Sequence, residues 1–271
     1  MPDKLLNLKL DIVFQELFGN QKNSEITSHL LSLILKREIN NIDLDVNKRM
    51  YGKNDNSKIG RLDVRAKFND GEDCNIELQV DKYEHMDKRM LEYWASMYNS
   101  KIHKGEMYGV LKPSISILIT DYELEQTKGI SEYHTKWNLR EEKSYERKLT
   151  NDIEMHILEI PKVKNANIEK DELAQWLMFI NDPDCREVKK FMEENKFFKQ
   201  AREELAYMSG DEYFQQAVED RVRFLMDQKE KEEKGKKELR ESIAKKMKDK
   251  NIPIDEIAEL TGLTKEEIEK L

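Results

Sequence analysis

Cysteine is scarce in this chain of 271 residues, which contains only Cys74 and Cys185. Neither has the spacing of a metal-ligand motif, so we expect two reduced thiols. The five histidines are dispersed, and no pair of them has zinc-site spacing. The glycine-rich phosphate loop of nucleotide-driven motors is also missing, as is any serine or cysteine nucleophile signature.

Long apolar runs are equally scarce. Residues 1–10 contain no apolar segment of the signal-peptide type, and runs such as 115–119 are far too short to span a membrane. We therefore expect a cytoplasmic protein with no membrane partner. Charged residues make up 38% of the chain and the mean hydropathy is -0.84, which indicates a lean core. The net charge of -8 argues against wholesale coating of nucleic acid but permits a local basic groove.

Two strictly alternating segments, 61–68 and 72–80, flank the turn sequence Asn69-Asp70-Gly71. Apolar and polar residues alternate in each segment, and a period of two predicts a strand with one buried face. Gly71 can adopt a positive φ at the end of a three-residue loop. The two segments are therefore predicted to form a β-hairpin.

The turn fixes the register of this hairpin. A three-residue loop pairs Phe68 with Glu72, which places Asp63 directly opposite Glu77. Gln79 follows on the same face. Two carboxylates about 5 Å apart at Cβ normally destabilise a sheet, but a divalent cation between them makes the pair tolerable. A solvated polar face on an ordinary hairpin is the alternative interpretation.

The other elements follow from their hydrophobic periods. In the first half of the chain, helices are predicted over 11–19, 25–37 and 83–104, and further strands over 42–51, 113–120, 133–139 and 153–160. From Asp171 only helices are expected, over 171–181, 186–196, 199–207, 211–250, 254–260 and 265–271.

The longest of the predicted C-terminal helices is highly charged. The predicted helix over 211–250 is a solvated helix, with contact to phosphates or a partner as the alternative, and Gly235 is a candidate break or bend. Residues 252–271 form a helical hairpin that is similar in outline to helix-turn-helix DNA readers. Thr264 and Glu267 have capping-box spacing. The second helix is acidic, which favours a packing or dimerising role over DNA reading.

The ordered set of elements resembles the core of the PD-(D/E)XK nuclease superfamily, and more narrowly the Rpn family of recombination-promoting nucleases, a transposase-type group. The segments that carry the resemblance are Asp11-Ile-Val-Phe14, Leu62-Asp63-Val64, Ile76-Glu77-Leu78-Gln79, Lys88-Arg89 with Tyr93-Trp94, and His103-Lys-Gly105. It implies an α/β fold: a restriction-endonuclease-like core, with a mixed sheet flanked by helices, followed by a helical C-terminal region. We expect a nuclease-like domain over 1–165 and a regulatory or oligomerisation region over 166–271.

The resemblance also implies a metal-dependent DNA endonuclease, a phosphodiester hydrolase acting in DNA recombination or phage defence. Asp63 and Glu77 would hold Mg²⁺, or another divalent cation such as Mn²⁺ or Ca²⁺. The carbonyl of Leu78 could add a ligand. Asp11 matches the family's N-terminal aspartate and could complete the site, with a helix N-cap as its alternative role.

The sequence departs from the broad superfamily pattern at Gln79, where lysine is usual, although Rpn-type families also have Glu-x-Gln. Arg65, on the same face as Asp63, could supply the missing positive charge. Arg89 could do so from the following helix, with Tyr93 donating a hydrogen bond. The alternatives are a salt bridge of Arg89 to acidic residues nearby and a core-edge position for Tyr93.

The expected partners are DNA, a second copy of the chain in a homodimer, and a self-derived C-terminal fragment that inhibits the nuclease. The alternative function is a catalytically inactive nuclease-fold binding module that works through its helical C-terminal half. The combination of Asp63, Glu77 and Gln79 favours the nuclease. The missing lysine and the acidic net charge favour the binding module.

Overall fold

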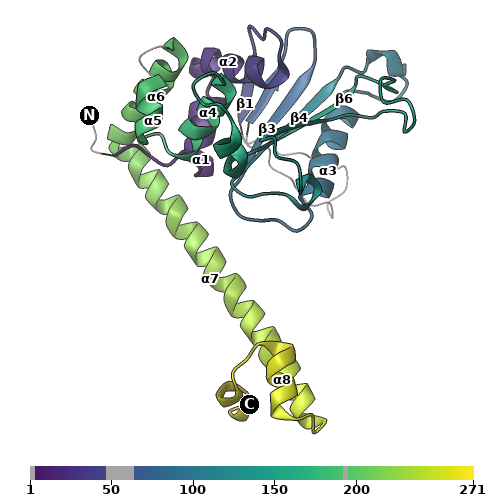
Figure 1. The fold of residues 1–271 in the computed structure, drawn as a ribbon, viewed down its shortest axis with the longest axis vertical. Helices are drawn as coiled ribbons and strands as arrows, with labels where there is room; N and C mark the ends of the chain where they lie inside the picture. Colours follow the sequence, from purple (N-terminus) through teal and green to yellow (C-terminus); the bar gives the residue numbers. More distant parts are fainter. Residues whose placement is uncertain (1–3, 47–63, 192–194) are drawn as a thin grey trace. The chain divides into compact units, whose positions relative to one another are not determined.

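The computed structural model describes residues 4–46, 64–191 and 195–271 (Figure 1). The chain divides into two compact units, Met1–Glu212 and Tyr213–Leu271. We expected a division at residue 165. Helices α4 (Glu172–Asn181) and α6 (Lys196–Gly210) instead belong to the first unit, because both pack against α2 (Ser24–Leu35).

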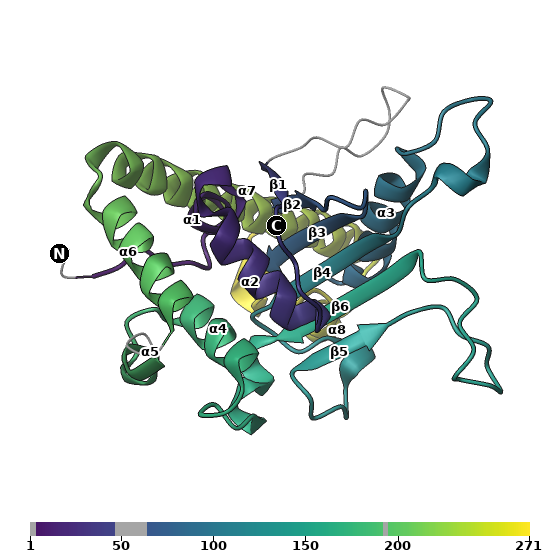
Figure 2. The same cartoon turned by 90° about the horizontal axis from the view of Figure 1, so that it is seen from above.

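The described strands form one six-stranded mixed sheet in the order β1-β2-β3-β4-β6-β5 (Figure 2). The strands are β1 (Asp43–Val46), β2 (Val64–Lys67), β3 (Asp73–Gln79), β4 (Ser114–Thr120), β5 (His134–Trp137) and β6 (Ile153–Glu159). The central β3, β4 and β6 are parallel, and the remaining pairs are antiparallel. This mixed sheet with flanking helices confirms the predicted fold class.

The β2–β3 hairpin has the predicted register. Val64 pairs with Ile76 and Ala66 with Cys74. The Phe68 amide donates to the Glu72 carbonyl at 2.9 Å, and Gly71 closes the turn with a φ of 86°. Asp63 lies outside the described residues, so its place opposite Glu77 stays a prediction.

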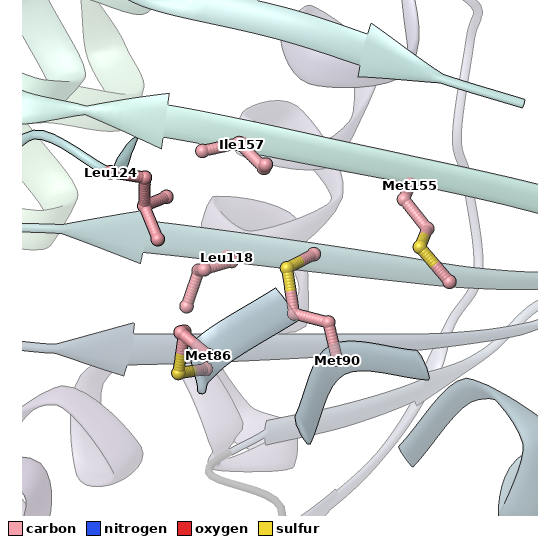
Figure 3. Packing of buried hydrophobic residues seen from close by; sticks show 6 residues of the cluster. All are labelled: Met86, Met90, Leu118, Leu124, Met155 and Ile157. Carbon is pink, nitrogen blue, oxygen red and sulfur yellow. The ribbon is translucent and has the colours of Figure 1, made fainter. Parts of the chain in front are cut away.

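Helices cover both faces of the sheet (Figure 1). On one side, α1 (Asp11–Gly19) packs against β2 and continues into α2. On the other, α3 (Met86–Asn99) packs against β4. It is shorter than the predicted helix over 83–104. Figure 3 shows its contact with the sheet, a cluster formed by Met86, Met90, Leu118, Leu124, Met155 and Ile157.

An aromatic core joins the later helices to the first two. The Trp176 side chain on α4 is fully buried and stacks on Phe198 of α6, with ring centroids 4.3 Å apart. It also meets Phe18 of α1 edge-on at 6.0 Å. Short helix α5 (Arg186–Phe191) follows α4. The first unit therefore needs residues well beyond the predicted boundary at 165 to complete its core.

The second unit contains a long helix followed by a helical hairpin. Helix α7 (Glu212–Asp249) runs uninterrupted through Gly235. Helices α8 (Ile254–Thr261) and α9 (Lys265–Glu269) follow it. Thr264 and Glu267 form the predicted capping box. The small core of this unit consists of Ala244, Ile257, Leu263 and Ile268. No helix in the described ranges is long and apolar enough to cross a membrane.

A series of hydrogen bonds links the edge strand β5 to its neighbour β6. Lys136 contacts a Glu154 carboxylate oxygen at 2.7 Å, and His156 Nε2 contacts the same oxygen at 2.8 Å. His156 Nδ1 lies 2.7 Å from His134 Nε2. An ionised carboxylate only accepts, so His156 donates from Nε2 and accepts at Nδ1 from His134.

These hydrogen-bonded side chains make the stability of the fold depend on pH. Burial, with His156 nearby, lowers the pKa of His134 from 6.5 to about 4. Burial opposes ionisation of Glu154, but hydrogen bonds from His156 and Lys136 outweigh it and lower its pKa from 4.5 to about 2. In both cases the unfolded chain binds protons first, so stability falls as the pH falls.

We expect the free energy of unfolding to decrease from pH 6.5 to 4 through His134, and from pH 4.5 to 2 through Glu154. Urea unfolding between pH 7 and pH 4 measures the first range. His134→Asn should flatten the curve there. An unchanged slope in this variant would exclude His134 as its source.

Candidate active site

The polar face of the β2–β3 hairpin is buried. Arg65 is 8%, Asn75 0% and Glu77 3% exposed. This contradicts the solvated-face interpretation. Charged groups at such depth require partners, because transfer from water without compensation is costly.

Glu77 has its partner on the facing helix. Its Oε1 lies 2.7 Å from Nη2 of Arg89, whose side chain is 30% exposed. The Arg89 Nε donates to the Tyr93 hydroxyl at 3.0 Å. The Arg89 guanidinium also lies 5.5 Å from the Tyr83 ring centre and 5.2 Å from that of Tyr93. The structure thus pairs Arg89 with the strand carboxylate Glu77, and its predicted role as a substitute for the usual lysine stays a prediction.

Tyr93 has the core-edge position that was the alternative prediction for it, whereas the hydrogen bond that it was predicted to donate stays a prediction. Its side chain is buried beside Met97, as a core residue would be. Its hydroxyl accepts the hydrogen bond from Arg89. Burial, followed by the nearby Glu77 charge, raises the pKa of Tyr93. Tyr93 therefore stays neutral and fixes the position of the guanidinium.

The side chains of the two residues that follow Glu77 in β3 are not directed at its carboxylate. The Gln79 side chain is half-buried, and its Nε2 donates to the Asp81 carbonyl at 3.0 Å. The Leu78 side chain is buried, and its alternate position in the strand places it on the opposite face. Leu78 can therefore contribute to the Glu77 site only through its backbone carbonyl.

Arg65 is held at the other end of β3. Its Nη2 donates to Asp73 at 2.6 Å, and Lys101 lies 3.5 Å from the same oxygen. Asp73 begins β3, four residues before Glu77. The structure therefore brings Arg89 to Glu77 and pairs Arg65 with Asp73.

Asp11 is the first residue of α1 and accepts from the Ile12 amide at 2.9 Å. The N-cap is Leu10, so the N-cap interpretation of Asp11 is wrong. The preceding segment reaches the end of β3. Lys9 contacts the Asp121 carboxylate at 2.9 Å, and the Asp121 amide donates to the Gln79 carbonyl at 3.1 Å.

Sequence reasoning missed two tyrosines near the Glu77–Arg89 pair. Tyr83, 46% exposed, lies against the Arg89 guanidinium. The Tyr122 hydroxyl accepts from the Tyr83 amide at 3.5 Å, and burial raises the pKa of Tyr122. Neither lies in a recognisable motif. Only the docking of α3 beside β4 brings them together.

The oxygen atoms near Glu77 are of the chemical type that binds a hard divalent cation. Glu77 offers a carboxylate and Leu78 a carbonyl, and Mg²⁺ prefers oxygen ligands. Within the described ranges, no group of three or more His, Cys, Asp or Glu residues could hold a metal ion. The second predicted carboxylate, Asp63, lies outside those ranges.

A mixed sheet with an acidic β-hairpin and a following helix is the arrangement of PD-(D/E)XK nucleases. Residues 8–235 match the family model of the PD-(D/E)XK nuclease family transposases, and the chain belongs to this family. Comparison with curated proteins and with solved structures gives no match. The predicted resemblance is confirmed at the level of this family, whose superfamily generally uses divalent metal ions.

Proposed function

We propose that this protein is a Mg²⁺-dependent DNA endonuclease that hydrolyses phosphodiester bonds in recombination or phage defence. The observation that carries the proposal is the buried carboxylate of Glu77, paired at 2.7 Å with Arg89 on the face of the acidic hairpin. Carboxylate oxygens are among the ligands that Mg²⁺ prefers.

Glu77 and Asp63 would hold the metal ion, with the Leu78 carbonyl and Asp11 as further ligands. A carbonyl has two lone pairs, so Leu78 can coordinate in addition to an existing hydrogen bond. When bound, the ion supplies an activated water and stabilises negative charge on the phosphate. Arg89 lies against Oε1 of this carboxylate, so the guanidinium and the ion would share one charged group.

Arg89 supplies the positive charge that a lysine at position 79 would supply. A guanidinium is always protonated, so Arg89 acts by electrostatic stabilisation and does not exchange a proton. Its hydrogen bond to Tyr93 and the flanking Tyr83 ring fix it in place. Preorganised charge of this kind stabilises a transition state without further reorganisation.

The alternative is a nuclease-fold binding module without catalysis. One observation favours it: Arg89 already neutralises Glu77, which weakens the attraction of this carboxylate for a cation. A chain of this kind would bind DNA or a protein but would not cut in any divalent metal.

Nicking of supercoiled plasmid by the full-length protein tests the proposal. We expect cutting in Mg²⁺ or Mn²⁺ and none in EDTA. If the full-length chain is silent, the same assay is repeated with the chain ended after Glu212, where the first compact unit ends. Activity there would support inhibition by the C-terminal unit. The proposal would be contradicted if neither the full-length protein nor the shortened chain cut the plasmid in any divalent metal.

A further inference from the structure

A cavity of about 800 Å³ lies at the start of β3, at the opposite end of the strand from Gln79. The β2–β3 turn, the end of α3 and the segment before β4 line it. Four cationic side chains reach it: Arg65, Lys67, Lys101 and Lys112. Only two carboxylates, Asp43 and Asp73, join them, so the lining carries an excess of two positive charges.

Lys101 forms part of the wall. Its ammonium lies 3.5 Å from Asp73 and donates to the carbonyls of Lys112 at 3.1 Å and Pro113 at 2.9 Å. These contacts use its three N–H donors. Lys101 therefore ties the end of α3 to the segment before β4 and has no donor left for a ligand.

Arg65 has a donor without a partner. It is 8% exposed and pairs with Asp73 through Nη2, while its Nε has no hydrogen-bond partner among the described residues. Asn75 lies opposite Arg65 in the register, is fully buried, and has neither its Oδ1 nor its Nδ2 bonded within the described part. Buried polar groups are nearly always hydrogen-bonded, and Arg65, unlike Asn75, lines the cavity, so its Nε indicates an occupant there.

Lys67 and Lys112 stand exposed at the rim. Lys67 lies on the same strand face as Arg65, two residues on. A Cβ placed at Gly71 would lie 3.3 Å from Cγ of Lys112, so the stem of Lys112 packs against the hairpin turn. Neither ammonium has an ion-pair partner among the residues that the structure describes.

We propose that this cavity is a second anion site that binds a phosphate group, held by Lys67 and Lys112 with Arg65 behind them. Arginine and lysine are the usual phosphate ligands. From Asp73 to Glu77 the strand rises about 13 Å. The phosphate bound here is therefore a different one from the phosphate at Glu77, on the same DNA. In this respect the inference rests on the proposed function.

The test measures binding by the full-length protein in EDTA, so that no cleavage is needed. The variant Lys67→Gln/Lys112→Gln is compared with Lys128→Gln/Lys143→Gln, which removes the same charge from exposed positions outside the cavity. Fluorescence anisotropy follows a labelled DNA duplex over a range of salt concentrations. Calorimetry follows dTMP, which carries the same phosphate chemistry as a free nucleotide.

We expect the rim variant alone to bind DNA more weakly, with the slope of log K against log salt reduced by about 1, the value for one phosphate. Loss of dTMP binding without a change in the DNA slope would assign the site to a free nucleotide. Equal behaviour of both variants towards both ligands would overturn the proposal. If the wild-type protein cleaves DNA with metal but the two variants have equal salt slopes, the phosphate site is excluded and the nuclease proposal stands. If the rim variant binds DNA more weakly but the wild-type protein does not cleave, the phosphate site stands without the nuclease.

Discussion

Glu77→Gln is expected to lower the rate of plasmid nicking by at least about 100-fold, the loss typical of removing one preorganised charged group from an active site. The substitution keeps the shape of the side chain but removes the charge that pairs with Arg89 at 2.7 Å and would hold the metal ion. Because Arg89 is 30% exposed, water can solvate the guanidinium left behind, and the fold should persist. Initial nicking rates and thermal unfolding measure the two effects.

Glu92→Gln is the matched control, since Glu92 is exposed on α3. We expect it to nick plasmid at the wild-type rate. Asp63→Ala should lose cleavage as Glu77→Gln does, with stability in the absence of metal unchanged or higher because repulsion is relieved. A clear loss of stability without a loss of cleavage would contradict the metal role of Asp63.

Lys162→Met is expected to destabilise the fold by about 3–5 kcal/mol, the cost of leaving a buried charge without its partner. Lys162 lies 2.6 Å from Glu159, and both side chains are almost fully buried. Lys162 also donates to the Thr127 carbonyl at 3.0 Å. Glu159 fixes the same turn by accepting from the Leu124 amide at 2.7 Å. Urea unfolding measures the loss.

Two further variants separate a buried pair from a surface pair. Lys128→Met breaks the exposed ion pair with Glu125 and should cost about 0–1 kcal/mol. Glu159→Leu/Lys162→Met removes both buried charges and should recover much of the loss. A loss below about 1 kcal/mol in Lys162→Met would show that water reaches the pair.

The hairpin could be predicted because its determinants are local. The alternation of residues 61–68 and 72–80 fixes which side chains share a face. A three-residue turn ending in Gly71 then leaves one register that keeps both apolar faces on the same side. The observed pairing of Val64 with Ile76 agrees with this reasoning. The residue ranges of α1 and β4 could be predicted from similarly local patterns.

The burial of the polar face could not be predicted in the same way. Charged residues on one face of a strand usually indicate solvent, and only the docking of α3 places Arg89 against Glu77. The pairing of Arg65 with Asp73 joins neighbouring strands, but nothing local chooses Asp73 over Glu77. The extent of the first unit depends on Trp176 and Phe198 packing together, a contact between separate helices.

Titration of Mn²⁺ into the full-length protein by calorimetry, with Asp63→Ala beside it, tests most directly whether the hairpin carboxylates form a metal site. We predict that the wild-type chain binds Mn²⁺ and that Asp63→Ala loses this binding while remaining folded. Equal binding by the two proteins would contradict the central claim and place the metal elsewhere.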